Sequence, residues 1–274
     1  MKSYDYIITG GGASGLLTAY RMVKDPFFSD SSILIIEKEK KNSNDRTWCY
    51  WESGEGEWDA ILETSWQKIV FKSELYTDSP KIAPYFYKMI RSARFYDLLF
   101  TELKQHSQVI FIEDKVISIT DQEECVSVAT QKKTYTAKKV LNSILFDKDY
   151  LHQKKYPVLQ QHFVGWFIKT DTDAFDAEKA TFMDFTIPQQ NNTRFMYVLP
   201  LSPKVALFEY TLFSANLLKE EEYEEGIRSY LEAVGIKEYQ ILEKEKGIIP
   251  MTSYPFWNQN TKNILHIGTA GGWS

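Results

Sequence analysis

The 274-residue sequence lacks several features that would assign it to a specialised class of protein. Its only cysteines, Cys49 and Cys125, are too few and too far apart for a disulfide framework or a metal knuckle. The four histidines are scattered, so no metal site is expected. The formal net charge of −5 leaves no basic surplus, which argues against nucleic acid as a partner.

Long apolar runs are also absent. No stretch approaches the roughly 18 apolar residues of a membrane-spanning helix, and the N-terminus enters a strand without a cleavable signal pattern. Hydrophobic residues nevertheless make up 43% of the chain, enough for a sizeable core. We therefore expect a globular protein that is cytoplasmic or docks on a membrane face.

The N-terminal segment has the pattern of a dinucleotide-binding unit. Tyr4–Thr9 predicts a buried strand, Ala13–Lys24 a helix and Ile33–Ile36 a second strand, which requires a parallel pair with a right-handed crossover. Glu37 ends the second strand, where a carboxylate can accept hydrogen bonds from a ribose. The turn matches G-x-G-x-x-G, and the residues expected to bind a diphosphate are Gly10, Gly12, Ala13, Ser14 and Gly15. The alternative is a glycine-rich turn followed by a surface glutamate.

The end of the chain indicates FAD rather than NAD. Ile264–Gly272 has the strand-then-glycine form of a second flavin motif, with Gly268, Thr269 and Gly271 as expected contacts. Thr269 stands where an Asp is usual, and its hydroxyl can still bond a ribityl group. The chain stops at Ser274 inside this motif, so we expect a C-terminal part to be missing; a stop codon after Ser274 in the gene would contradict this.

The middle of the chain predicts an antiparallel sheet. Period-two alternation marks strands at His162–Lys169, Thr181–Phe185, Arg194–Leu199 and Val205–Leu212. Helical spacing predicts helices at Tyr87–Lys104 and Glu220–Val234, whereas Asn42–Glu57 has no clean period and is expected to be loop.

These elements predict the α/β fold class with two domains. A Rossmann-type FAD-binding domain is expected over residues 1–48, 85–150 and 255–274. An inserted antiparallel-sheet substrate domain is expected over residues 49–84 and 151–254. This layout is typical of FAD-binding two-domain enzymes rather than of simple dehydrogenases.

Several further stretches occur in an order and spacing that generic FAD oxidoreductases do not share. They are DRTWCYWE (Asp45–Glu52), YKMIR (Tyr87–Arg91), QHFVGWFIK (Gln161–Lys169), FMDF (Phe182–Phe185), RFMYVL (Arg194–Leu199), EYTLFS (Glu209–Ser214), GIIPMT (Gly247–Thr252) and HIGTAGGW (His266–Trp273). With this set, the sequence resembles the bacterial lycopene beta-cyclases.

The resemblance implies a fold similar to flavin monooxygenases and geranylgeranyl reductases, with a carotenoid tunnel between the two domains. It implies closure of the linear ends of lycopene into beta rings, giving gamma-carotene and beta-carotene, without net redox change. It also implies that FAD must be reduced, with NAD(P)H as reductant. Because lycopene and related carotenes are carried in membranes, peripheral contact with the inner face of the cytoplasmic membrane is implied too.

Cyclisation needs an acid that protonates an alkene carbon and a base that later removes a proton. Glu209 is the first candidate, because it matches the family's acid and lies in an otherwise apolar strand where a carboxyl pKa should rise. The alternative is a solvent-facing residue of an alternating strand. Asp184 is the second candidate, which would orient Glu209 or share its proton; alternatively it ends a strand ladder or pairs with Arg194.

Aromatic residues can stabilise a cation and suit a flat polyene. The resemblance implies that Trp48, Trp51 and Trp166 bind substrate and that Arg46 approaches the flavin; plain core packing is the alternative for each aromatic residue.

Two other functions remain open from the sequence. One is a different FAD-dependent enzyme of the same architecture, a monooxygenase or an isoprenoid reductase, which would consume NAD(P)H stoichiometrically. The other is an inactive flavin-binding fragment.

Overall fold

The computed structural model describes residues 3–146 and 148–273. The chain divides into two compact units, which are described separately. The first comprises Met1–Ser43, Ala93–Pro157 and Ser253–Ser274, and the second comprises Asn44–Ser92 and Val158–Thr252.

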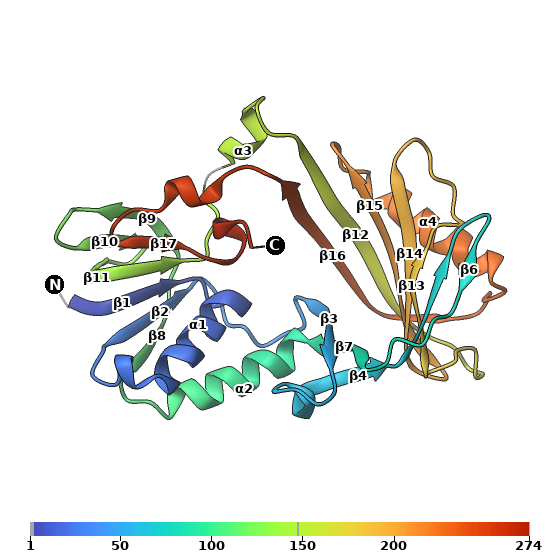
Figure 1. The fold of residues 1–274 in the computed structure, drawn as a ribbon, viewed down its shortest axis with the longest axis horizontal. Coiled ribbons are helices and arrows are strands. Elements are labelled where there is room, and N and C mark those ends of the chain that lie inside the picture. Colours follow the sequence, from blue (N-terminus) through green and yellow to red (C-terminus); the bar gives the residue numbers. More distant parts are fainter. Residues whose placement is uncertain (1–2, 147, 274) are drawn as a thin grey trace. The chain divides into compact units, whose positions relative to one another are not determined.

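The first unit is built on a sheet with strand order β8-β2-β1-β11-β10-β9, in which β17 also pairs with β11 (Figure 1). Strands β8, β2, β1, β11 and β17 run parallel, whereas β10 is antiparallel to both β11 and β9. The strands are β1 (Ser3–Thr9), β2 (Ile33–Glu37), β8 (Val109–Glu113), β9 (Val116–Asp121), β10 (Val126–Thr130), β11 (Thr134–Asn142) and β17 (Ile264–His266). The expected α/β fold class with a Rossmann-type unit is confirmed.

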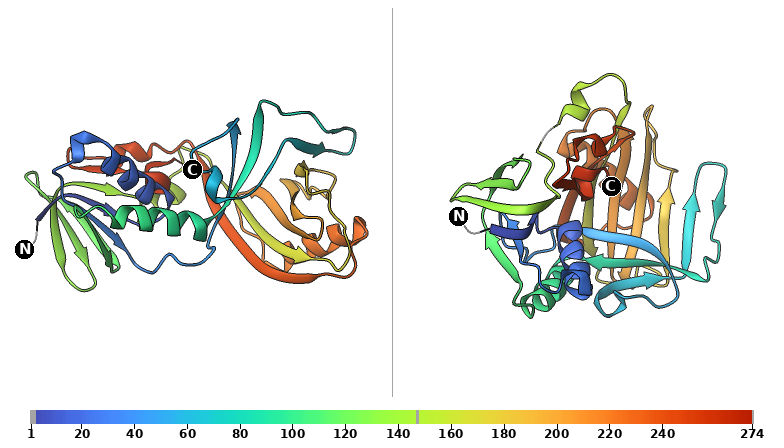
Figure 2. Two further views of the ribbon diagram at one scale, coloured as in Figure 1. Left: turned by 90° about the horizontal axis from the view of Figure 1, so that it is seen from below. Right: turned by 60° about the vertical axis from the view of Figure 1, so that its left-hand side comes forward.

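Two helices cover one face of this sheet. They are α1 (Ala13–Lys24) and α2 (Ser92–Lys104), which lie on the same side of the strands (Figure 2). Right-handed crossovers from β1 to β2 and onward to β8 place both helices there. Leu16 and Leu99 are completely buried on these helices. The short helix α3 (Asp149–His152) follows later in the chain.

The second unit contains two sheets. The larger has the order β16-β12-β15-β14-β13-β5-β6 and the smaller the order β3-β7-β4. The larger sheet consists of β5 (Lys68–Lys72), β6 (Thr77–Asp78), β12 (Val158–Lys169), β13 (Lys179–Asp184), β14 (Thr193–Ser202), β15 (Val205–Ser214) and β16 (Gln240–Thr252). The smaller consists of β3 (Thr47–Ser53), β4 (Leu62–Trp66) and β7 (Tyr85–Arg91).

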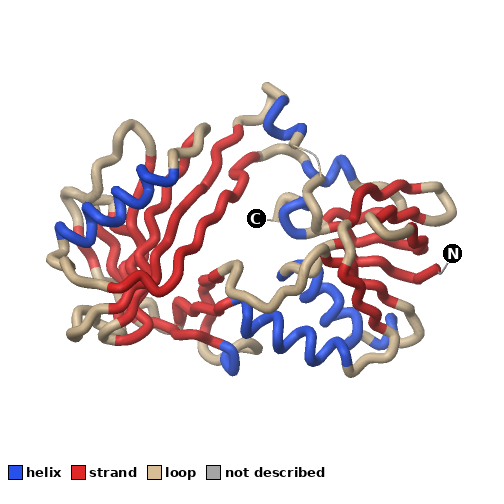
Figure 3. The backbone as a smooth tube through the Cα atoms, turned by 180° about the vertical axis from the view of Figure 1, so that it is seen from behind, coloured by secondary structure: helices blue, strands red, loops and turns tan. Residues whose placement is uncertain are grey.

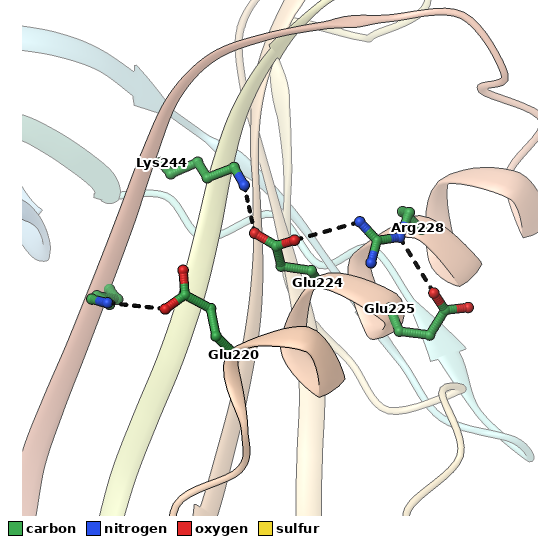
Figure 4. A network of polar contacts seen from close by, with 6 residues as sticks. Glu220, Glu224, Glu225, Arg228 and Lys244 are labelled. Atoms are coloured by element: carbon green, nitrogen blue, oxygen red, sulfur yellow. Dashed lines mark hydrogen bonds and ion pairs between the residues drawn. The ribbon is translucent and has the colours of Figure 1, made fainter.

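The helix α4 (Glu220–Ala233) crosses one face of the larger sheet (Figure 3). Its buried residues, such as Ile227 and Leu231, pack against Trp166, Phe208 and other side chains of that face. Ion pairs join its polar side to β16: Lys244 bonds Glu224 (Figure 4), and Lys246 bonds Glu220. The opposite face packs in a separate cluster with residues of the smaller sheet, including Trp66, Tyr87 and Met89.

The strand expectations for the middle of the chain are confirmed, but two expectations near residue 50 and residue 90 are wrong. Asn42–Glu57 is not all loop, because Thr47–Ser53 forms β3. The helix expected from Tyr87 begins only at Ser92, because residues 85–91 form β7 and pair with β3 and β4 on both sides. These pairings place residues 85–92 in the second unit, not in the first. The helical spacing was misleading because partner strands decided the conformation.

Packing beneath α4 gives a stability prediction. Ile227 is fully buried, so Ile227→Ala removes apolar contacts and leaves a cavity. We expect the free energy of unfolding in urea to fall by about 2–5 kcal/mol. Leu75→Ala is the control, because Leu75 is 98% exposed and its truncation should change the free energy by less than about 0.5 kcal/mol. Equal effects of both substitutions would contradict the packing.

Candidate functional site

The turn after β1 is shaped by its three motif glycines. Gly10 has a φ of +94°, a conformation that favours glycine, and a Cβ there would overlap the hydroxyl of Ser143. A Cβ on Gly15 would overlap the carbonyl oxygen of Gly10, so the helix can approach the strand only with glycine at that position. A Cβ on Gly12 would meet nothing within 4 Å. The space in front of Gly12 is therefore open.

Glu37 is held against this turn. Its Oε2 accepts a hydrogen bond from the Gly11 N–H at 2.6 Å, and its Oε1 accepts one from the Lys38 N–H at 2.9 Å. The carboxylate at the end of β2 thus lies beside the glycine turn, as expected for a group that binds a ribose.

The second glycine segment meets the first. The short turn of helix η4 (Gly268–Gly271) follows β17, which pairs with β11 next to β1. Gly268 has a φ of +55°, and a Cβ there would overlap the hydroxyl of Ser14 at the start of α1. Thr269 is exposed. The predicted residues Gly10, Gly12, Ala13, Ser14, Gly15, Glu37, Gly268, Thr269 and Gly271 therefore lie in one unit, on segments that converge.

These residues fit a dinucleotide. Gly12 caps α1 without a side-chain hydrogen bond, so the first N–H groups of the helix have no side-chain acceptor there. The open space at Gly12 leaves room for backbone to approach a diphosphate. Arg46 belongs to the second unit, where its Nη1 donates to the Asp45 carbonyl at 2.6 Å.

Glu209 lies in the middle of β15, on the face of the larger sheet that α4 does not cover. Its neighbours Phe208 and Tyr210 point toward α4, whereas Leu207 packs on the other face with residues of the smaller sheet. Alternation therefore directs Glu209 to the Leu207 face. The only hydrogen bond of its carboxyl group among the described residues comes from the Thr211 hydroxyl at 2.7 Å.

Burial controls the protonation of Glu209. The side chain keeps a small solvent-accessible area but is surrounded by protein, and this desolvation, followed by the charge of Glu245, raises its pKa to about 8. Burial also raises the pKa of Cys49, Tyr87 and Tyr197, which are coupled electrostatically to Glu209. Glu209 is thus a carboxylic acid at neutral pH, with three uncharged titratable neighbours and one nearby carboxylate, Glu245, and the protonated state is the one that a proton donor needs.

Asp184 is separated from Glu209 by the sheet itself. The Asp184 carboxylate accepts hydrogen bonds from the Tyr230 hydroxyl of α4 at 2.7 Å and from the Thr186 hydroxyl at 2.6 Å, and it pairs with Lys72 at 3.4 Å. Burial opposes ionisation, but these hydrogen bonds and Lys72 hold the pKa of Asp184 below its usual value. The structure thus contradicts proton sharing between Asp184 and Glu209.

The expected alternative partner of Asp184 is also corrected, since Lys72 and not Arg194 forms the ion pair. Arg194 instead donates to Asn192, Gln190 and Tyr210.

The three candidate tryptophans have different positions. Trp166 is 1% exposed and packs beneath α4 with Ile227, on the face opposite Glu209, so its expected role in substrate binding is contradicted by strand alternation. Trp51 is 42% exposed, with ring centroids 4.8 Å from Tyr87 and 5.3 Å from Phe182. Trp48 is half-buried. Because successive residues of a strand point to opposite faces, Trp48 lies on the face of β3 opposite to Thr47, Cys49 and Trp51.

Glu245 of β16 is a site residue that the sequence reasoning missed. It accepts a hydrogen bond from the Thr47 hydroxyl at 2.6 Å, and burial raises its pKa. The sequence feature that could have identified Glu245 is the alternation of charge in EKEK (residues 243–246). Lys244 and Lys246 bond the glutamates of α4 (Figure 4), so Glu243 and Glu245 must face the other way.

Comparison with solved structures defines the class of fold. The chain is similar to a geranylgeranyl bacteriochlorophyll reductase-like protein from Thermoplasma acidophilum, with a TM-score of 0.71 at 13% identity, covering 99% of this chain and 72% of that one. It is also similar to a flavin-dependent brominase, with a TM-score of 0.68 at 14% identity, covering 98% and 72%. The fold is therefore that of the FAD-dependent monooxygenases and reductases.

Sequence comparison assigns the chain to one family within that class. The family described as lycopene cyclase protein matches residues 5–274, and the chain belongs to it. A lycopene beta-cyclase of Pantoea ananas is 25% identical over 268 residues, covering 93% of this chain and 65% of that protein. A lycopene beta-cyclase of Paracoccus sp. is 29% identical over 117 residues, 41% of this chain. The chain thus spans 65% and 30% of the length of these two relatives.

Two features are absent from residues 3–146 and 148–273. No helix there is long and apolar enough to cross a membrane. No group of three or more His, Cys, Asp or Glu side chains there is placed to hold a metal ion.

The raised pKa of Glu209 predicts a pH-dependent effect on stability. Between pH 4.5 and 8 the unfolded chain loses the Glu209 proton while the folded protein keeps it, so folding becomes less favourable as pH rises through this window. Glu209→Gln removes this penalty. We expect the stability of the variant relative to wild type to increase from pH 5 to pH 8, by at most ~1.4 kcal/mol per pH unit.

Urea unfolding at several pH values measures the effect of Glu209→Gln. Glu225→Gln is the matched control, because Glu225 is 69% exposed and pairs with Arg228 at the surface. A difference between Glu209→Gln and wild type that is flat with pH would contradict the assignment of Glu209 as a neutral buried acid.

Proposed function

We propose that the protein is a lycopene beta-cyclase that converts the linear end groups of lycopene to beta rings without net redox change. The observation that carries this proposal is Glu209, a carboxylic acid kept protonated at neutral pH on an apolar face. Membership of the lycopene cyclase family supports the substrate class. The flavoprotein fold and the glycine turn support a bound dinucleotide.

Glu209 supplies the proton that begins the reaction. Its carboxyl group transfers the proton to a carbon of the terminal alkene, which forms a C–H bond and leaves a carbocation on the adjacent carbon. A second alkene of the same end group attacks this cation and closes the ring. A carboxylate then removes a proton from the ring carbon next to the new cation, which forms the ring double bond and returns a proton to the protein.

The surroundings of Glu209 suit a carbocation. Tyr87, Tyr197 and Phe167 belong to the cluster on this face, and aromatic faces attract cations. Apolar walls also exclude water, which would otherwise trap the cation as an alcohol.

FAD is the proposed cofactor of the first unit. The N–H groups at Gly12, Ala13 and Ser14 would hold its diphosphate, Glu37 its ribose, and Gly268, Thr269 and Gly271 the region of its ribityl chain. Reduced flavin, when bound, supplies negative charge that stabilises a cation, which is why a redox-neutral enzyme would require NAD(P)H as a reductant. Arg46 as a further flavin contact remains a prediction.

Carotenes are the proposed partners. Because carotenes are carried in membranes, the proposal includes peripheral contact of the protein with the inner face of the cytoplasmic membrane. The side chain of Trp51 is the remaining aromatic candidate for substrate contact, because it is exposed beside Tyr87.

A second candidate is another flavoenzyme of this architecture. The similarity to a flavin-dependent brominase and to a reductase-like protein favours it, because both share the fold. Such an enzyme would consume one NAD(P)H for each product, whereas the cyclase consumes none.

Gly12→Ala separates nucleotide binding from folding. A Cβ at Gly12 meets no protein atom within 4 Å and its φ of −80° suits alanine, so the variant should fold as wild type. The same Cβ would occupy the space that the diphosphate needs, so we expect FAD affinity to fall at least about tenfold, or about 1.4 kcal/mol. Flavin fluorescence titration measures affinity, and circular dichroism checks the fold.

Gly15→Ala is the comparison variant for this test. Its Cβ would overlap the Gly10 carbonyl oxygen, so it should lose both thermal stability and FAD binding. Unchanged FAD affinity of folded Gly12→Ala would argue against the glycine turn as the diphosphate site.

Glu209→Gln tests the catalytic proposal. The amide keeps the size of the side chain but carries no acidic proton, so we expect cyclisation of lycopene to fall about 10²–10⁴-fold. The full gene product, its Glu209→Gln variant and Glu225→Gln as control are expressed in lycopene-accumulating cells, and the pigments are separated by chromatography.

The outcomes distinguish the candidate functions. Beta rings from wild type and control but not from Glu209→Gln support the cyclase. Persistence of lycopene with all three proteins, each folded and flavin-loaded, would rule the cyclase out and favour the other flavoenzyme. NAD(P)H consumption in proportion to product would do the same.

A further inference from the structure

Glu209 and Glu245 lie on either side of one glycine. Gly165 in the middle of β12 is directly opposite Glu209 of β15 and also directly opposite Glu245 of β16. Since neighbouring strands are about 4.8 Å apart, the two glutamate Cα atoms are separated by about 10 Å, and Gly165 of β12 contributes no side chain between them. Two glutamate side chains that lean toward each other can span such a gap.

Position 165 has room for glycine only, because a Cβ there would come too close to neighbouring side chains. A Cβ on Gly165 would come within 2.9 Å of Leu207 Cδ1 and 3.1 Å of Glu245 Cγ. Glu245 Oε1 would be 3.4 Å from the same atom. The side chain of Glu245 therefore lies over Gly165, in the direction of Glu209's strand.

Hydroxyl groups hold both carboxyl groups on this face. The Thr211 hydroxyl donates to Glu209 at 2.7 Å, and the Thr47 hydroxyl donates to Glu245 at 2.6 Å. Neither glutamate forms an ion pair with any described residue. A single proton held between them is the arrangement that avoids two buried negative charges.

The other charged groups on this face compensate the charge of the pair only in part. Arg91 pairs with Glu243 at 2.6 Å and stacks over Phe167 at 4.0 Å, so its charge is shared with another carboxylate. Arg91 and Arg46 lower the pKa of Glu245, whereas Glu243 raises it. The remaining titratable neighbours, from β3, β7 and β14, are Cys49, Tyr87 and Tyr197, and burial keeps all three neutral.

We propose that Glu245 is a positioning residue for the proton donor, and that Glu209 and Glu245 share one proton across Gly165. The proposal rests on the proposed cyclase function and adds a partner to its acid. Burial disfavours the charged form of Glu209, and the charge of Glu245 adds to this effect, so Glu209 stays protonated. When Glu209 gives its proton to the alkene, the pair becomes doubly negative beside the carbocation.

Glu209 and Glu245 also take up the proton that is released at the end of the reaction. Loss of a proton from the ring carbon breaks one C–H bond and returns one proton to the pair, which matches the C–H bond formed in the first step. No oxidant or reductant is consumed, and the pair is restored to its singly protonated form.

Glu245→Gln tests the pair without requiring activity. The full gene product is labelled with carbon-13 at glutamate carboxyl groups, and the Glu209 signal is identified by its loss in Glu209→Gln. In wild type we expect this signal to titrate near pH 8. In Glu245→Gln the midpoint should fall by at least about one pH unit, a tenfold change in proton affinity.

Two further variants complete the titration experiment. Glu245→Asp keeps the charge and should retain a higher midpoint than Glu245→Gln. Glu225→Gln removes an exposed carboxylate elsewhere in the unit and should leave the midpoint unchanged. A Glu209 midpoint in Glu245→Gln equal to that of wild type would overturn the proposal.

Activity is a separate readout. If lycopene is cyclised, the high-pH limit of the rate should move to lower pH in Glu245→Gln, by the same interval as the titration. If the titration shifts while no protein cyclises lycopene, the shared proton stands and the cyclase function fails.

Discussion

Side-chain alternation across the larger sheet is the constraint on which the second unit depends. Each of its central strands must direct one set of residues to α4 and the next set to the smaller sheet. Phe208 and Glu209 are therefore neighbours in the chain but belong to different environments, one an apolar core and the other a face on which burial raises the pKa of a carboxyl group. A shift of one residue in register would exchange the two sets and bury the wrong side chains beneath the helix.

The two faces carry opposite electrostatic arrangements. On the α4 face, Asp184 is ionised and fully satisfied by Tyr230, Thr186 and Lys72, which joins helix to sheet. On the other face, Glu209 has one hydroxyl partner and no cation, so its charge is disfavoured. The first arrangement stabilises the fold, and the second destabilises it above pH 4.5. A loss of stability of this kind is typical of functional sites, where an ionisable side chain is held in a protonation state that it would not adopt in water.

The first unit depends on a different constraint, the pairing of strands that are far apart in the sequence. Its sheet is closed by β11 and β17, which come from the middle and the end of the chain and pair in parallel beside β1. The close approach of Gly268 to Ser14 follows from this pairing, and it brings the two glycine segments together. A reductase-like protein and a flavin-dependent brominase share the fold over 99% and 98% of the chain, so the fold by itself does not assign a reaction.

The sequence by itself determined the local parts of the protein. The G-x-G-x-x-G turn, Glu37, most strands and α4 were predictable because their signals, glycine spacing and short-range periodicity, depend on neighbours in the chain. The family was also evident from short motifs such as EYTLFS. The conformation of residues 85–91 was not, because pairing with β3 and β4 overrode a helical pattern. Only the tertiary structure decided that Asp184 and Trp166 lie away from Glu209 while Glu245 lies beside it across Gly165, because the face on which a side chain lies and its cross-strand neighbours depend on strand register, which is a long-range property.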